Sequence, residues 1–162
     1  VNLNQLATLL CQRQFSKADS LVDFIADNEK TRQIRAYTDV LNHRFNDENF
    51  EIVKSSGKLN EVVMLLAMKR NNTAYKESKA LTDDTAENLY IKAICANRAS
   101  KEAADINSNA MLYMEAMDLL KAAIEKDPSY NRIAENDDDI IDLLKDVVFQ
   151  NNKKNTSMKD EE

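Results

Sequence analysis

The near absence of glycine and proline constrains this chain more than any other feature. Its 162 residues include one glycine, Gly57, and one proline, Pro128. Tight hairpins between β-strands need residues at positive φ, usually glycine, so a sheet of several strands is disfavoured. Hydrophobic residues make up 43% of the chain and charged residues 31%, which is typical of a folded chain with a buried core. We therefore predict an all-α fold.

The charge balance argues against nucleic-acid binding, and the lengths of the apolar runs argue against a membrane-spanning helix. The formal net charge is −6 and the basic residues are scattered among acidic ones, which disfavours nucleic-acid binding. The longest apolar run, Val62–Met68, is far shorter than the ~20 residues of a membrane-spanning helix. The chain starts at Val1 without an initiator methionine, so we expect a processed product or a fragment.

Apolar residues recur at intervals of three and four, and this spacing predicts antiparallel helix hairpins over residues 3–28, 58–81 and 86–127. Ser16 is a candidate N-cap in the first hairpin, and residues 82–85 are a candidate capping turn before the third. Residues 31–45 predict a further amphipathic helix, and residues 46–57 a loop with a short helical turn. We expect a polar break over residues 99–109.

The C-terminal part of the sequence predicts a short helix over residues 130–134 and a capping helix over about 139–149. Residues 150–162 contain one apolar residue and are predicted to be a disordered tail. Residues 1–149 are predicted to form a single helical-repeat domain.

The second helices of the three hairpins share a stripe that begins with a small residue, followed by residues four and seven positions later. The stripes are Ala18-Val22-Ile25, Ala74-Ser78-Leu81 and Ala116-Leu120-Ala123. Such a stripe lies on one face of a helix, and its small residue permits close approach of a neighbour. Pro128 follows the third stripe by five residues, where it would end the helix.

This spacing resembles the second half of a tetratricopeptide repeat. The resemblance implies a short α-solenoid of antiparallel helix hairpins, closed by the C-terminal capping helix. The pattern departs from the family: tryptophan is absent and Lys30 stands where the first unit would have proline.

Residues 57–145 also resemble the helical repeat region of envelope and fimbria-assembly proteins of Bacteroidales bacteria. The strings that carry this resemblance are "LNEVVMLLAMKRNNTAYKESKAL", "AENLYIKAICANR" and "LLKAAIEKDPSYNRIAENDDDI". It implies a non-catalytic scaffold of the bacterial cell envelope, in the periplasm or on the outer surface. Its partner would be a protein, a peptide or another domain of the parent chain. The alternatives are a cytoplasmic tetratricopeptide adaptor or co-chaperone and, more remotely, a helical enzyme with an acidic site.

In the repeat register, Tyr90, Ile94, Asn97 and Arg98 point from one helix toward the concave face of the solenoid. An aromatic ring, an amide and an arginine on a rigid helix suit peptide recognition, with the arginine binding a carboxylate. These four residues are the candidate partner-binding groove. The alternative is that Tyr90 and Ile94 only pack between helices.

The sequence predicts no catalytic residue, metal ligand or cofactor site. His43 is the only histidine, and we expect it to be exposed at a helix end. The run Asp137–Asp139 lacks the alternating ligands, central glycine and distal glutamate of a calcium loop, so we predict a structural turn there. With one glycine in the chain, phosphate-binding loops are excluded.

The cysteines and a methionine-rich segment are assigned to the core. Cys11 and Cys95 have apolar neighbours at helical spacing, which predicts two buried thiols. Met111, Met114 and Met117 could form an adaptable binding groove, but their helical spacing favours core packing.

Overall fold

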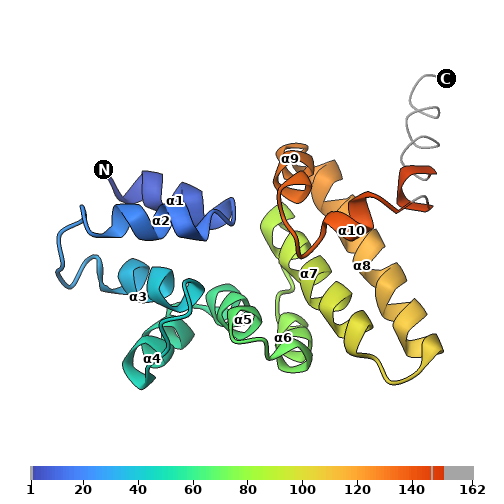
Figure 1. Ribbon diagram of the computed structural model, residues 1–162, viewed down its shortest axis with the longest axis horizontal. Helices are drawn as coiled ribbons and strands as arrows, with labels where there is room; N and C mark the ends of the chain where they lie inside the picture. The colour runs from blue at the N-terminus through green and yellow to red at the C-terminus, as the bar shows by residue number, and fades with distance from the viewer. Residues whose placement is uncertain (1, 147, 152–162) are drawn as a thin grey trace.

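The computed structural model describes residues 2–146 and 148–151, and within those ranges the chain is helical and contains no strand (Figure 1). The all-α prediction is thus confirmed. The helices are α1 (Leu3–Cys11), α2 (Phe15–Val22), α3 (Arg32–Leu41), α4 (Asp47–Ser56), α5 (Lys58–Ala67), α6 (Asn71–Ser78), α7 (Ala86–Glu102), α8 (Ile106–Lys126), α9 (Ser129–Glu135) and α10 (Ile141–Leu144).

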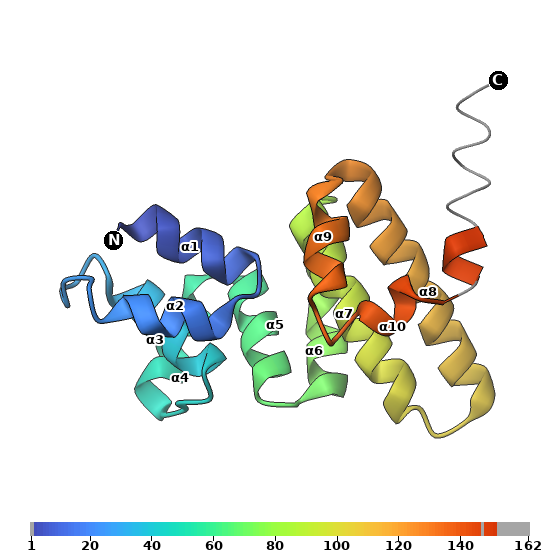
Figure 2. The same cartoon turned by 45° about the horizontal axis from the view of Figure 1, so that its top comes forward.

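Helices that are neighbours in sequence pack against each other along most of the chain. The most extensive contact joins α7 and α8, the two longest helices, and α3 and α5 also touch α5 and α7 respectively. Figures 1 and 2 show α1 to α4 at one end, α5 and α6 in the middle, and α7 to α10 at the other end. One cluster of buried apolar side chains extends from Leu6 to Phe149.

The three stripes identified in the sequence are buried, as their spacing predicts. All nine side chains are at most 8% exposed, and the small residue that begins each stripe is fully buried. The third stripe packs α8 into the core, and α8 ends at Lys126. Pro128 follows as the N-cap of α9, so it separates two helices as expected.

Short polar side chains fix where several helices begin. Asn2, Asn46, Thr85 and Asp105 each accept a hydrogen bond from the backbone N–H three residues later. Each therefore satisfies one of the N–H groups that a helix start leaves without a partner. The expected capping turn before the third hairpin is thus confirmed at Thr85.

The structure corrects three of the predicted boundaries. Residues 46–57 are not mainly a loop, because Asn46 caps the ten-residue helix α4 and Gly57, at φ 141°, separates it from α5. The break predicted over residues 99–109 is confined to 103–105, because Asp105 caps α8 directly after α7 ends. Ser16 is not an N-cap; α2 begins one residue earlier, at Phe15.

The C-terminal part is also interrupted where one capping helix was predicted. Helix α10 covers only Ile141–Leu144, and a second helical turn covers residues 148–151. Residues 150 and 151 were predicted to be part of a disordered tail, but they are helical. The rest of that predicted tail, residues 152–162, lies outside the described residues.

Candidate functional site

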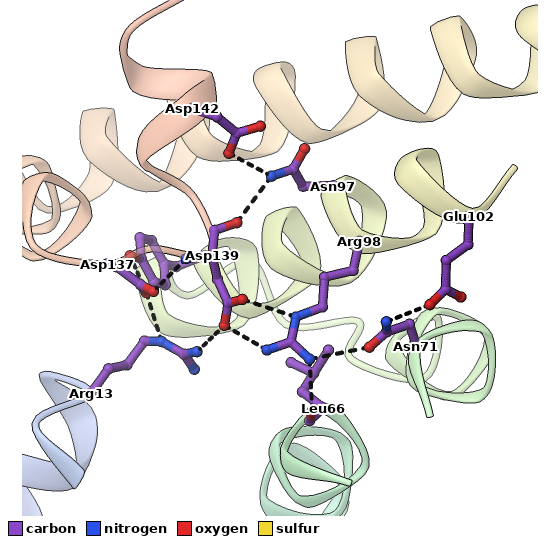
Figure 3. A network of polar contacts seen from close by, with 10 residues as sticks. Arg13, Leu66, Asn71, Asn97, Arg98, Glu102, Asp137, Asp139 and Asp142 are labelled. Atoms are coloured by element: carbon purple, nitrogen blue, oxygen red, sulfur yellow. Dashed lines mark hydrogen bonds and ion pairs between the residues drawn. The ribbon is translucent and has the colours of Figure 1, made fainter. Parts of the chain in front are cut away.

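The four predicted groove residues lie on one face of α7, but the chain covers most of that face itself. Tyr90, Ile94 and Asn97 are at most 1% exposed, and only the guanidinium of Arg98 keeps partial contact with solvent. The segment between α9 and α10, residues 136–140, lies across this face (Figures 2 and 3). Tyr90, Ile94 and Asn97 are therefore inaccessible to a partner in this structure, because the C-terminal segment occupies their side of the helix.

Asp139 is the centre of a network of polar contacts between this segment and the two ends of the molecule (Figure 3). Arg98 donates two hydrogen bonds to its carboxylate, with N–O distances of 3.1 and 2.6 Å. Arg13, two residues after the end of α1, donates a third at 2.7 Å. Arg98 was predicted to bind a carboxylate of a partner peptide, whereas in the structure it binds a carboxylate of its own chain.

Asp137 binds the same two regions from the other side of the turn. Its Oδ2 accepts a hydrogen bond from the hydroxyl of Tyr90 at 2.8 Å. The same oxygen lies 2.6 Å from Nε of Arg13, in an ion pair that lacks hydrogen-bond geometry. The backbone carbonyl of Asp137 also accepts from the N–H groups of Ile140 and Ile141, so the acidic run is the structural turn that was expected.

Burial would raise the pKa of Asp139, but the hydrogen bonds and positive charges of Arg98 and Arg13 outweigh it. The pKa of this carboxyl is therefore held below its usual value of about 3.8, and it is ionised at neutral pH. Burial and the neighbouring Asp137 carboxylate raise the pKa of Tyr90, so its phenol stays protonated and can donate.

Arg98 and Asn97 extend the network to further helices. Arg98 Nη1 donates to the carbonyl of Leu66 in the last turn of α5 (2.6 Å) and to Oδ1 of Asn71 (3.1 Å). Asn97 Nδ2 donates to the carbonyl of Asp139 (2.9 Å) and to a carboxylate oxygen of Asp142 (3.0 Å). Its Oδ1 is buried without a hydrogen-bond partner among the described residues.

Three helices end with the same backbone motif, and sequence reasoning missed this repetition. The residue two positions after α1, α3 and α5 has φ of 61°, 66° and 58°, and these are Arg13, His43 and Lys69. Each of the three N–H groups bonds the carbonyl three residues back, and the next N–H bonds the carbonyl five residues back, which is a Schellman motif. Glycine or asparagine is usual at this position, yet all three residues are basic.

These three residues line one cleft, which we call the basic cleft. Its volume is about 500 Å³. The basic side chains around it are Arg13, His43, Lys69, Arg98 and Lys101, and its one acidic side chain is Asp139. Its remaining lining residues are Phe15, Leu41, Val63, Leu66, Ala67 and Asn71. A cleft with this lining can hold a carboxylate next to an apolar side chain.

A larger and more polar cleft lies between the α1–α2 turn and α9, with a volume of about 1220 Å³. Arg13 and Phe15 line both this cleft and the basic cleft. Lys17 and Arg132 contribute positive charge and Glu135 negative charge. The rest of its lining is mostly amide and hydroxyl side chains, without a converging set of reactive groups.

The other candidate residues have structural positions or are exposed singly. His43 is exposed just after α3, as predicted. Cys95 is buried as expected, and burial raises its pKa to about 12. The prediction for Cys11 is wrong, because this residue is exposed, although its Sγ lies 3.7 Å from the carboxylate of Glu87 on α7.

The methionine prediction is correct only for Met117. Met111 and Met114 are 74% and 49% exposed, and the fully buried side chains of α8 all lie in its second half, from Ala116 onward. Among the described residues, no group of three or more His, Cys, Asp and Glu side chains is placed to bind a metal ion. None of the described helices is long and apolar enough to cross a membrane.

Comparison of this chain with protein-family models, with curated proteins and with solved structures gave no match.

Proposed function

We propose that this chain is a non-catalytic scaffold for protein–protein interaction, built as a short tetratricopeptide-like α-solenoid with α10 as part of its C-terminal cap. The observation that carries the proposal is the repetition of one helix-end motif after α1, α3 and α5. A repeated corner sets a repeated angle between consecutive helices, which is how helix pairs stack into a solenoid. The three buried stripes at the register of the repeat support the same arrangement.

The state of the reactive side chains favours a binding function over catalysis. The carboxylates of Asp137 and Asp139 are both engaged by arginines and hydrogen-bond donors. Cys95 has a raised pKa and is buried, so its thiolate is not available as a nucleophile at neutral pH. We place the scaffold in the bacterial cell envelope, because of the resemblance of residues 57–145 to repeat regions of envelope and fimbria-assembly proteins.

Site-specific photo-crosslinking in a Bacteroidales host tests this function. A photoreactive amino acid is introduced separately at Lys101 on the rim of the basic cleft and at the exposed residues Met111 and Lys30. At least one position is expected to give a discrete adduct with an envelope protein, which then binds the purified chain in calorimetry. If none of the positions gives a protein adduct, or if the chain fractionates with the cytoplasm, the proposed scaffold or its location is wrong.

A further inference from the structure

The basic cleft has a charge opposite to that of the chain as a whole. The chain contains 28 acidic residues and 22 lysines and arginines, yet four lysines and arginines, the histidine His43 and one acidic residue line this cleft. Two of the cations have carboxylate partners besides Asp139: Arg13 pairs with Asp137, and Lys101 with Asp142 at 3.3 Å. Lys69 and His43 make no ion pair with any other described residue. Lys69 is therefore the cation whose charge is available to a ligand.

Lys69 also has a left-handed backbone conformation that is less favourable for lysine than it would be for glycine. A left-handed conformation at a helix end is accommodated best by glycine, because Cβ of other residues crowds the backbone. Sparsely populated conformations of this kind cluster at functional sites, where the side chain has a role. The chain keeps a lysine here, and the same choice of a basic residue recurs at Arg13 and His43, which line the same cleft.

The cleft already holds one carboxylate, which shows the chemistry it accepts. Asp139 reaches it from the chain's own C-terminal segment and binds Arg98 and Arg13 with three hydrogen bonds. Beside it, the half-buried side chains of Phe15 and Ala67 provide apolar surface. We propose that this cleft docks an extended acidic segment of a partner protein, with a carboxylate at Lys69 and an apolar side chain against that surface.

The occupant is a peptide segment because of the size and charge of the site. A volume of about 500 Å³ accommodates a few side chains, and the mixture of cations and apolar surface matches acidic residues that alternate with apolar ones. A nucleic acid or an anionic membrane would require a wide basic face, whereas this cleft is confined to about 500 Å³ and the chain as a whole has a net charge of −6. This inference rests on the proposed scaffold function and names the kind of partner it binds.

Fluorescence anisotropy with the full chain tests the proposal. The probe is a short labelled peptide in which aspartate and glutamate alternate with leucine, and the matched probe has asparagine and glutamine in place of the acids. The measurement is made at physiological ionic strength, where charges beyond ~8 Å are screened. The acidic probe is expected to bind and the neutral probe to bind at least about tenfold more weakly, since the ion pairs are lost.

Two substitutions of Lys69 separate binding from folding. Lys69→Glu is expected to weaken binding of the acidic probe about tenfold, and Lys69→Gly about fivefold. Lys69→Gly is also expected to raise Tm by about 2–4 °C, because glycine relieves the left-handed backbone. Lys30→Glu makes the same charge change at an exposed lysine outside the cleft and is expected to leave binding unchanged.

Equal binding of the two probes, no binding of either, or unchanged binding by both Lys69 variants would overturn the proposal. Binding of the chain to anionic vesicles but not to the acidic probe would overturn it in favour of a membrane surface. A protein adduct at Met111 without probe binding would leave the scaffold function intact and reject only this cleft as its docking site.

Discussion

Replacing Asp139 with asparagine should destabilise the whole molecule, because this carboxylate joins its two ends. The substitution preserves the shape of the side chain but removes the charge that accepts three hydrogen bonds from Arg13 and Arg98. The side chain of Arg13 is only 9% exposed, so loss of the Asp139 charge leaves a largely buried guanidinium with less negative charge beside it. A hydrogen bond to a charged group contributes about 1.5–3 kcal/mol, and the asparagine oxygen retains part of it.

The side chain of Asp139 is 27% exposed, so water can replace part of the hydrogen bonding that the substitution removes. We therefore expect the free energy of unfolding to fall by about 2–4 kcal/mol. For a domain of this length, that corresponds to a decrease in Tm of roughly 5–15 °C. Asp138→Asn is the matched control, because the neighbouring side chain is exposed and forms none of the ion pairs among the described residues.

The assay is thermal unfolding followed by far-UV circular dichroism, together with urea unfolding at neutral pH. If Asp139→Asn and Asp138→Asn unfold within about 1 °C of each other, the network does not hold the two ends together, and the reasoning from Figure 3 is wrong.

Three further results are expected. The pKa of Asp139 is lowered in the folded state, so the stability that its carboxylate contributes is complete above about pH 4 and is lost as the pH falls through the folded pKa. The difference in unfolding free energy between wild type and Asp139→Asn, measured by urea titration, should therefore shrink below about pH 4. A difference that stays constant would contradict the lowered pKa of Asp139. Gly57→Ala should lower the free energy of unfolding in urea by about 1–3 kcal/mol, because φ at this position is 141°, a backbone conformation that alanine rarely adopts. Steric crowding does not contribute, since no atom lies within 4 Å of the added Cβ. An unchanged urea midpoint would show that the backbone there adjusts freely. A thiol reagent should modify Cys11 in the native protein and Cys95 only in denaturant. The reaction at Cys11 should be slow, because burial and the Glu87 carboxylate raise the pKa of the Cys11 thiol. If both thiols react equally fast in the native protein, Cys95 is not buried.

Much of the helical structure was predictable because its causes are local. The small residues Ala18, Ala74 and Ala116 and their stripe partners repeat at helical spacing, and they are buried as that spacing requires. Thr85 caps α7 by accepting a hydrogen bond from the N–H three residues later, so this cap could also be predicted from the sequence. Helix α4 was missed because its residues alternate less regularly, whereas its cap at Asn46 and its end at Gly57 were both visible in the sequence.

The candidate site was predicted only in part. Spacing placed Tyr90, Ile94, Asn97 and Arg98 on one face of α7, but it assigned the carboxylate at Arg98 to a partner peptide, whereas in the structure Asp139 of the same chain binds there. The repeated backbone motif at Arg13, His43 and Lys69 did have a sequence signal. In each case a basic residue stands two positions after the end of a helix, where glycine would be usual.

The sequence by itself determined that this chain is helical, where most of its helices lie and which of their faces are apolar, because each of these depends on residues within a turn or two of one another. Only the tertiary structure decided what covers α7 and where the positive charges converge. Arg13 and Asp139 are 126 residues apart, and their pairing depends on how all the intervening helices pack. The same packing brings three helix ends to one cleft, where their basic residues become a candidate docking site for an acidic segment.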